Sequence, residues 1–189
     1  MIKKVSLLNK ILEVILKNEG GFVNDPYDLG GATNFGITEK TLEDFLGKKV
    51  TIQEVKDLDI ELAKKIYILK YYTTSRIDEF PNSMKLNLFD MLVHSGEKNT
   101  MLTLQKAINQ TFLTSSSIQV ELIADGIGGS KTISACYDLE KIFGFEIFRK
   151  VFLTKRKEFL EKIILKAPEQ MVFFIGWMNR LDNLAKIDL

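Results

Sequence analysis

The sequence is poor in cysteine and histidine, with one residue of each. Cys136 cannot form a disulfide within the chain, and no spacing of cysteine or histidine suits a metal site. We therefore expect no metal and no cofactor, and we interpret Cys136 as a small core residue. An excess of either charge is also lacking, because 26 basic residues against 25 acidic residues give a formal net charge of +1. Such a balance provides no overall field that would draw the protein to nucleic acid.

Extended apolar stretches are absent as well. Near the N-terminus, Lys10, Glu13 and Lys17 interrupt the apolar residues, and no small-residue cleavage site follows them. No stretch reaches the length that a membrane span requires. We therefore expect synthesis in the cytoplasm without a signal peptide, and no integral membrane segment.

The sequence does contain helical periodicity, in a chain long enough to bury a core. Its 189 residues are 46% apolar and 27% charged, which is ordinary for a globular protein. Apolar residues recur at helical spacing, and caps such as Thr38 with Gly47 and Thr51 with Glu54 mark short helices. The predicted helices cover residues 5–19, 38–47, 51–56, 59–72, 82–95, 99–112, 133–166 with Gly144 as a candidate break, and 168 onward.

Residues 19–38 depart from this pattern, because five glycines and Pro26 lie within them. Glycine and proline at this density mark turns rather than a long helix. The segment has the length of a β-hairpin, with residues 22–23 and 34–37 as arms and 25–31 as the turn region. The sequence thus predicts a mainly α fold with one small β-hairpin.

Glu19 stands where the first helix meets this segment. Ile11, Ile15 and Glu19 follow one another at intervals of four residues and so lie on one face of the helix. A carboxylate therefore stands at the end of an apolar stripe that we expect to be buried. Burial and the negative end of the helix dipole both disfavour the charged form, and a protonated carboxyl is what a general acid needs. The ordinary alternative is a glutamate that reaches solvent at a frayed helix end.

Asp28 and Thr33 are the candidates for a second catalytic group, since folding the hairpin back would bring either of them towards Glu19. An acid that protonates the leaving oxygen, with a second group that positions water or stabilises the cation, is an arrangement that cleaves glycosides. The ordinary alternatives are turn-forming roles for Asp25 and Asp28 and a strand position for Thr33.

The run E-G-G-F-V-N-D-P-Y-D-L-G-G-A-T-N-F-G-I-T at residues 19–38 closely resembles the N-terminal signature of the glycoside hydrolase family 108 N-acetylmuramidases. The resemblance implies a lysozyme-like α+β fold with the hairpin beside an active-site cleft, and Glu19 as the catalytic acid. It also implies cleavage of the β-1,4 bond between N-acetylmuramic acid and N-acetylglucosamine in peptidoglycan. The order Glu, Asp, Thr is similar to the phage endolysin triad, but four residues rather than five separate Asp28 from Thr33, and Asn34 stands at the endolysin spacing.

The resemblance continues along the chain. Tyr71 and Tyr72 stand where the family has Tyr-Trp, and Asp90 begins a match to Asp, three residues, Asn-Ser-Gly in which His94 replaces the Asn. The candidate substrate-binding residues are Asp25, Asn34, Tyr71, Tyr72, Asp90 and His94. The ordinary alternatives are core or rim packing for the tyrosines, and a hydrogen-bonded pair for Asp90 and His94, which lie four residues apart on one helix face.

Two motifs in the second half also resemble the family. Residues 125–132 are similar to a D-G-x-x-G-x-x-T turn of its peptidoglycan-binding region, and residues 176–180 match a closing G-W-x-N-R motif. We interpret Trp177 as a core residue and the basic residues of 149–157, Arg156 among them, as a solvated face. The expected division is a catalytic region at 1–95 and a helical peptidoglycan-binding region at 96–189, packed into one globule.

The expected partner is the glycan strand of peptidoglycan, and the expected state is a monomer. Because that substrate lies outside the inner membrane, the resemblance implies action in the periplasm or cell wall after release by a holin or another export route. Two alternatives stay open at this point. A lytic transglycosylase also needs one glutamic acid, and a non-catalytic wall-binding secretion partner needs none.

Overall fold

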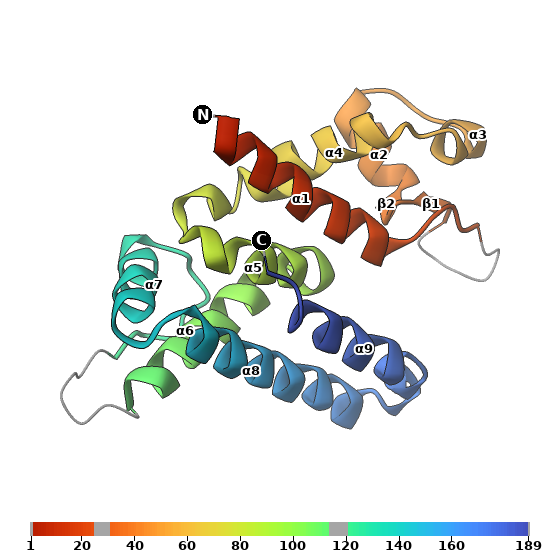
Figure 1. Ribbon diagram of the computed structural model, residues 1–189. Coiled ribbons are helices and arrows are strands. Elements are labelled where there is room, and N and C mark those ends of the chain that lie inside the picture. The colour runs from red at the N-terminus through yellow and green to blue at the C-terminus, as the bar shows by residue number, and fades with distance from the viewer. Residues whose placement is uncertain (1, 25–30, 114–120, 189) are drawn as a thin grey trace. The chain divides into compact units, whose positions relative to one another are not determined.

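The computed structural model describes residues 2–24, 31–113 and 121–188, with only the backbone described for residues 2–6. Helices make up most of it (Figure 1), and the only strands among these residues form one two-stranded antiparallel sheet. The predicted mainly α fold with one small β-hairpin is therefore confirmed. The packing within the chain forms two units, an N-terminal unit of residues 1–71 and a C-terminal unit of residues 72–189.

The N-terminal unit is built on the predicted apolar stripe of its first helix. Its elements are α1 (Ile2–Glu19), β1 (Thr33–Asn34), β2 (Ile37–Thr38), α2 (Glu39–Leu46), α3 (Ile52–Lys56), α4 (Ile60–Tyr67) and the start of the π-helix η1 (Ile68–Tyr72). The buried apolar side chains that form its core include Ile11, Leu12, Ile15, Leu16, Leu42, Val55, Ala63 and Ile66. Burial of this stripe fixes which face of α1 points inward, and so where the helix presents its last residue.

Local capping signals set the ends of the short helices as the sequence predicts. The hydroxyl of Thr38 accepts a hydrogen bond from the backbone N–H of Thr41, and Gly47 ends α2 with a left-handed φ of 68°. Thr51 and Glu54 form the reciprocal capping box at the start of α3. These helices depend little on distant parts of the chain for their boundaries.

The hairpin turns at a different place from the one the sequence suggested. Thr33 pairs with Thr38 and Asn34 with Ile37, so Phe35 and Gly36 are the two turn residues rather than part of an arm. Both have positive φ, 51° and 70°, which is the geometry of a two-residue turn with both central residues left-handed. Val23 of the other predicted arm pairs with Thr33 through two backbone hydrogen bonds of 2.8 Å.

The helix predicted over residues 59–72 also changes character. The helical spacing of Leu62, Ile66 and Leu69 predicts that these residues share one side of it, yet Leu69 is exposed and the residue beside Ile66 in the core is Tyr67. The regular helix α4 already buries Ala63, Ile66 and Tyr67, so its inward face differs from the predicted one, and the wider turn of η1 rotates only the side chains after Tyr67. This difference matters because Tyr67 and Tyr71 belong to the candidate site.

The C-terminal unit is helical. Its elements after η1 are η2 (Ile77–Glu79), α5 (Asn82–Ser95), α6 (Glu97–Leu113), α7 (Ser130–Phe143), α8 (Phe145–Lys166), η3 (Pro168–Phe173) and α9 (Phe174–Leu184). Helix α6 packs against α5, α7 and α8, and α8 also packs against η3 and α9, beside which it runs in Figure 1. Helix α5 is buried on nearly all sides from Met84 to Leu92, as expected of a central helix.

Cys136 and Gly144 of this unit have the places that the sequence predicts. Cys136 is fully buried, and burial raises the pKa of its thiol, so it is the expected core residue. Gly144 separates α7 from α8.

The packing places α5 in one unit with the later helices, whereas the sequence assigned it to the catalytic region. A functional boundary at residue 95 stays a prediction. No helix within 2–24, 31–113 and 121–188 is both long and apolar enough to cross a bilayer.

We expect Gly144→Ala to lower the free energy of unfolding by about 1–3 kcal/mol, because φ at this position is 79° and L-residues rarely adopt that conformation. Gly176→Ala is the matched control. It lies within α9, a Cβ there meets nothing within 4 Å, and alanine should stabilise the helix by about 0.5–1 kcal/mol. Urea unfolding of both variants measures the difference, and equal shifts would contradict the stated role of Gly144.

Candidate active site

Glu19 is the last residue of α1 and its side chain is half-buried. Ile11 and Ile15, two turns and one turn earlier on the same face, have no exposed surface. Gly20 then adopts a φ of 80° and ends the helix, as the sequence predicted. The carboxyl group therefore sits where the buried stripe of α1 meets the surface, rather than on a frayed end.

The turn of the hairpin lies directly against this carboxyl group. A Cβ atom on Gly36 would lie 2.8 Å from Oε2 of Glu19 and 2.9 Å from the hydroxyl of Tyr67. No residue with a side chain fits there without moving one of those groups. Glycine at position 36 thus serves both a left-handed turn and a close approach of backbone to the acid.

Tyr67 holds the other turn residue in place. Its hydroxyl donates a hydrogen bond of 2.8 Å to the carbonyl oxygen of Phe35, across 32 positions of sequence. Phe35 has a φ of 51°, an uncommon conformation for a bulky residue. Strained residues of this kind persist where their surroundings hold them, and they gather at functional sites.

Tyr71 completes the cluster. Its ring centroid lies 5.6 Å from that of Tyr67, and its side chain is half-buried. Burial raises the pKa of Tyr71 and the negative charge of Glu19 raises it further, against a hydrogen bond with Thr41 that lowers it. Of the predicted substrate-binding residues that the structure describes, Tyr71 is the one brought together with Glu19.

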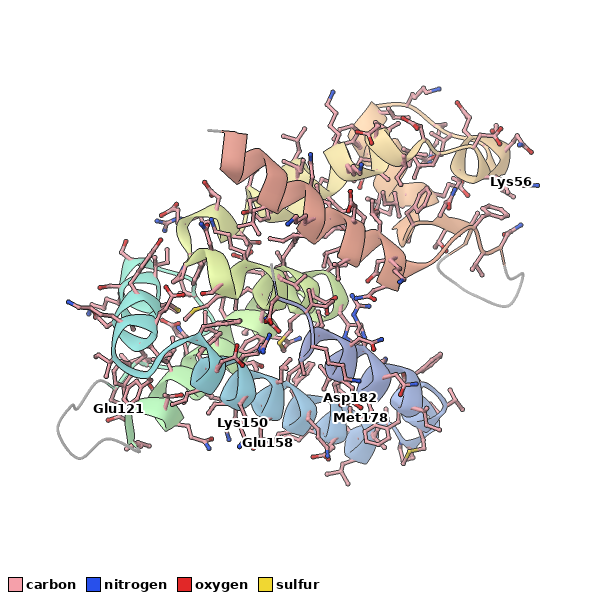
Figure 2. The ribbon with its side chains drawn as sticks, viewed as in Figure 1. Lys56, Glu121, Lys150, Glu158, Met178 and Asp182 are labelled. Carbon is pink, nitrogen blue, oxygen red and sulfur yellow. The ribbon has the colours of Figure 1, made fainter. Side chains whose placement is uncertain are left out.

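Other predicted residues of the N-terminal unit have different places. Asn34 is buried, and its amide donates hydrogen bonds to the carbonyl oxygens of Val55 and of Lys56, which Figure 2 labels, at 3.2 and 2.9 Å. These bonds fasten the hairpin to α3, so Asn34 is a structural residue rather than a contact for substrate. Thr33 is half-buried on β1, and its catalytic role stays a prediction. Asp25 and Asp28 lie outside the described residues.

Two predicted residues of the C-terminal unit are packed inside it. Tyr72 is buried with its ring edge-on to Phe89 at 5.2 Å, and burial, with the charge of Asp78, raises its pKa to about 12. Asp90 has no exposed surface at all. Tyr72 therefore packs in the core, which was the alternative to a role in substrate binding. Asp90 offers no surface that a substrate could contact.

The partners of Asp90 are two arginines that the sequence did not connect with it. Nη1 of Arg156 lies 2.7 Å from one carboxylate oxygen, and Arg180 makes bonds of 2.9 to 3.0 Å to both oxygens. Burial acts to raise the pKa of Asp90, but the charges of Arg156 and Arg180 outweigh it and hold the pKa below its usual value. Arg156 is itself fully buried, so its assignment to a solvated face was wrong.

His94 stands at the edge of this cluster. Its Nδ1 lies 3.5 Å from Nη2 of Arg156 and 3.4 Å from the hydroxyl of Ser95, and its ring lies edge-on to Trp177 at 5.8 Å. Burial, then Arg156 and Arg180, lower the pKa of His94 to about 4. A guanidinium only donates, so Nδ1 accepts and the neutral ring carries its proton on Nε2.

The half-buried Trp177 is less enclosed than the core residue that the sequence predicted. Nothing in the local sequence indicates that Arg156 is buried. Arg180 could have been recognised from the sequence, because it closes the motif at 176–180. Over the described parts of the chain, no group of three or more His, Cys, Asp or Glu side chains is arranged to hold a metal ion.

The mainly helical make-up with one small antiparallel hairpin is that of a lysozyme-like fold, and the half-buried Glu19 lies at a helix end against this hairpin. A family model described as Glycosyl hydrolase 108 matches residues 12–96, and one described as Predicted Peptidoglycan domain matches residues 99–182. Residues 12–96 are thus a glycosyl hydrolase 108 domain, a peptidoglycan domain follows them in the chain, and the protein is a peptidoglycan hydrolase.

The structure is similar to that of SagA from Brucella abortus. The TM-score is 0.71 at 29% sequence identity, and the match covers 94% of this chain and 91% of that one. A comparison with curated proteins gives no match.

Gly36→Ala should reduce peptidoglycan hydrolysis by at least about 10²-fold, because its methyl group displaces Glu19 or Tyr67. Gly47→Ala is the matched control. Its φ of 68° nearly equals the 70° of Gly36, so the backbone strain is alike, but nothing lies within 4 Å of the new Cβ. Initial rates on purified cell wall, with thermal unfolding of both variants, check this expectation. Equal activity in the two variants would contradict it.

The low pKa of His94 predicts a pH-dependent stability. The unfolded chain takes up a proton at about pH 6.5, whereas the folded protein does so only near pH 4. The free energy of unfolding of the wild type should therefore fall by up to about 3 kcal/mol between pH 6.5 and 4, relative to His94→Asn, with no such difference above pH 6.5. Urea unfolding at a series of pH values measures it, and parallel curves would show that His94 is not held neutral.

Proposed function

We propose that the protein is an N-acetylmuramidase that cleaves the β-1,4 bond between N-acetylmuramic acid and N-acetylglucosamine, with Glu19 as general acid. The observation that carries the proposal is the contact of the Glu19 carboxyl with the backbone of Gly36 and the hydroxyl of Tyr67. A general acid needs a fixed position relative to the bond that breaks, and these neighbours restrict where the carboxyl group can lie.

In this mechanism the protonated carboxyl of Glu19 gives its proton to the glycosidic oxygen as the bond from that oxygen to the muramic carbon breaks. Positive charge then develops on the sugar ring, and a second group stabilises it or positions the water that completes hydrolysis. Asp28 is our first candidate for the second group, by its place in the family signature, and Thr33 is the alternative. Tyr71, beside Glu19, is the candidate to contact the sugar, since aromatic rings pack well against sugar faces.

The place of action follows from the substrate. Peptidoglycan lies outside the inner membrane, so we propose that the protein acts in the periplasm or cell wall. It would reach that compartment through a holin lesion or a dedicated export route. We propose that it works as a monomer, since one copy of the chain supplies Glu19 together with all the neighbours described for it.

Glu19→Gln tests the catalytic assignment. The amide keeps the shape of the side chain and removes the transferable proton, so we expect the rate of peptidoglycan cleavage to fall by about 10²- to 10⁴-fold. Glu13→Gln is the matched control, because it removes the same charge from an exposed position on the same helix. Reducing-end release from purified wall measures both variants.

If the Glu19→Gln variant cleaved purified wall as fast as the Glu13→Gln variant, the assignment of Glu19 as the general acid would be refuted. Mass spectrometry of the wild-type digest decides the reaction type, because hydrolysis adds one water to each cleaved bond. A product lighter by one water would instead identify a lytic transglycosylase. Binding of wall without any cleavage by the wild type would point to a non-catalytic role.

A further inference from the structure

A separate pocket lies within the C-terminal unit, among α5, α6, α8, η3 and α9. Its volume is about 230 Å³, and His94 and Trp177 line it. Its apolar wall includes Phe159 and Ile163, and its polar groups include Gln170. A space of this size holds a small group, such as the end of a peptide, rather than a long glycan strand.

Buried positive charge lies behind the His94 wall. Arg156 and Arg180 share the single carboxylate of Asp90, and the effect of the two arginines on the His94 ring outweighs that of Asp90. Arg156 is fully buried and comes within 3.5 Å of the ring. Charge in such a place is poorly screened by water and salt, so the His94 side of the pocket favours a negative group.

The groups on the wall suit the same kind of ligand. Because Nδ1 of His94 faces Arg156 and Ser95, the ring donates through its Nε2–H, and the indole N–H of Trp177 is also only a donor. The side-chain amide of Gln170 adds a further donor. Phe173 stacks on Trp177 at 6.2 Å and is 54% exposed, which extends the apolar wall outward.

We propose that this pocket binds a free carboxylate of a peptidoglycan stem peptide, with the carboxylate towards His94 and an alanine-sized side chain against Phe159, Ile163 and Trp177. Within peptidoglycan the free carboxylates belong to the peptide stems, whereas the acetylated sugars of the strand are uncharged. The pocket would therefore recognise the peptide rather than the glycan, and would favour stems whose terminal carboxylate is not used in a cross-link. The inference rests on peptidoglycan as the substrate of the proposed function.

The chain contains one tryptophan, so Trp177 reports on the pocket without labelling of other sites. The probes are a synthetic stem pentapeptide ending in D-Ala-D-Ala, its C-terminal amide, and a chito-oligosaccharide without peptide. We expect the free acid to shift the Trp177 indole resonance and fluorescence in a saturable way. The amide should bind about tenfold or more weakly, since a hydrogen bond to a charged group contributes about 1.5–3 kcal/mol.

Variants of the wall give a second test. His94→Leu should weaken binding of the free acid about tenfold, and His94→Gln, whose amide also donates, should retain it within about threefold. Leu165→Ala is the control, because Leu165 is 81% exposed on α8 and does not line the pocket. Equal binding of acid and amide by the wild type would overturn the proposal without any mutation. A response of Trp177 to the oligosaccharide alone would overturn it in favour of a sugar subsite.

The binding test is independent of catalysis. Glu19→Gln protein should bind the free acid as the wild type does, because Glu19 belongs to the other unit. If Glu19→Gln still cleaves wall while the peptide binds, the catalytic assignment fails and the pocket stands. If Glu19→Gln is inactive while neither peptide shifts Trp177, the pocket proposal fails alone.

Discussion

The close approach of the hairpin turn to the Glu19 carboxyl holds the candidate active site together. It requires left-handed backbone at Phe35 and Gly36, and it leaves no room for a side chain at position 36. Tyr67 stabilises the strained turn through the carbonyl oxygen of Phe35, while the amide of Asn34 ties the strand before it to α3. The acid is thus positioned by backbone and by buried polar bonds, both of which are stiffer than surface side chains.

A second polar cluster organises the C-terminal unit. The carboxylate of Asp90 bonds Arg156 of α8 and Arg180 of α9, so three helices meet at one buried charge. Charged pairs in such places bring little net stability but strongly disfavour alternative packings that leave one partner unpaired. Burial, together with the surplus positive charge, keeps His94 neutral, and in our proposal that charge makes its side of the pocket attractive to a carboxylate. One arrangement of charge therefore serves both packing and recognition.

The family match and the packing divide the chain differently, and α5 explains why. The glycosyl hydrolase 108 match extends to residue 96 and includes α5, yet α5 packs with α6 and α8 in the C-terminal unit. Asp90 and His94 lie on this helix. The last helix of the hydrolase match is consequently part of the core of the C-terminal unit, so a cut at residue 96 would expose a helix that is buried on nearly every side.

Local patterns in the sequence were enough to predict the caps at Thr38, Gly47 and Thr51, the helix break at Gly144, and the position of Glu19 at the end of the stripe of α1. These features involve residues within a few positions of one another, so their signals can be read along the chain. The folded chain was needed to show that Phe35 and Gly36 form the turn, that Asn34 bonds to α3, and that Arg156 is buried against Asp90. The bonds of Asn34 and Tyr67 reach partners 21 and 32 positions away, and nothing in the local pattern of polar residues says which distant group will satisfy them.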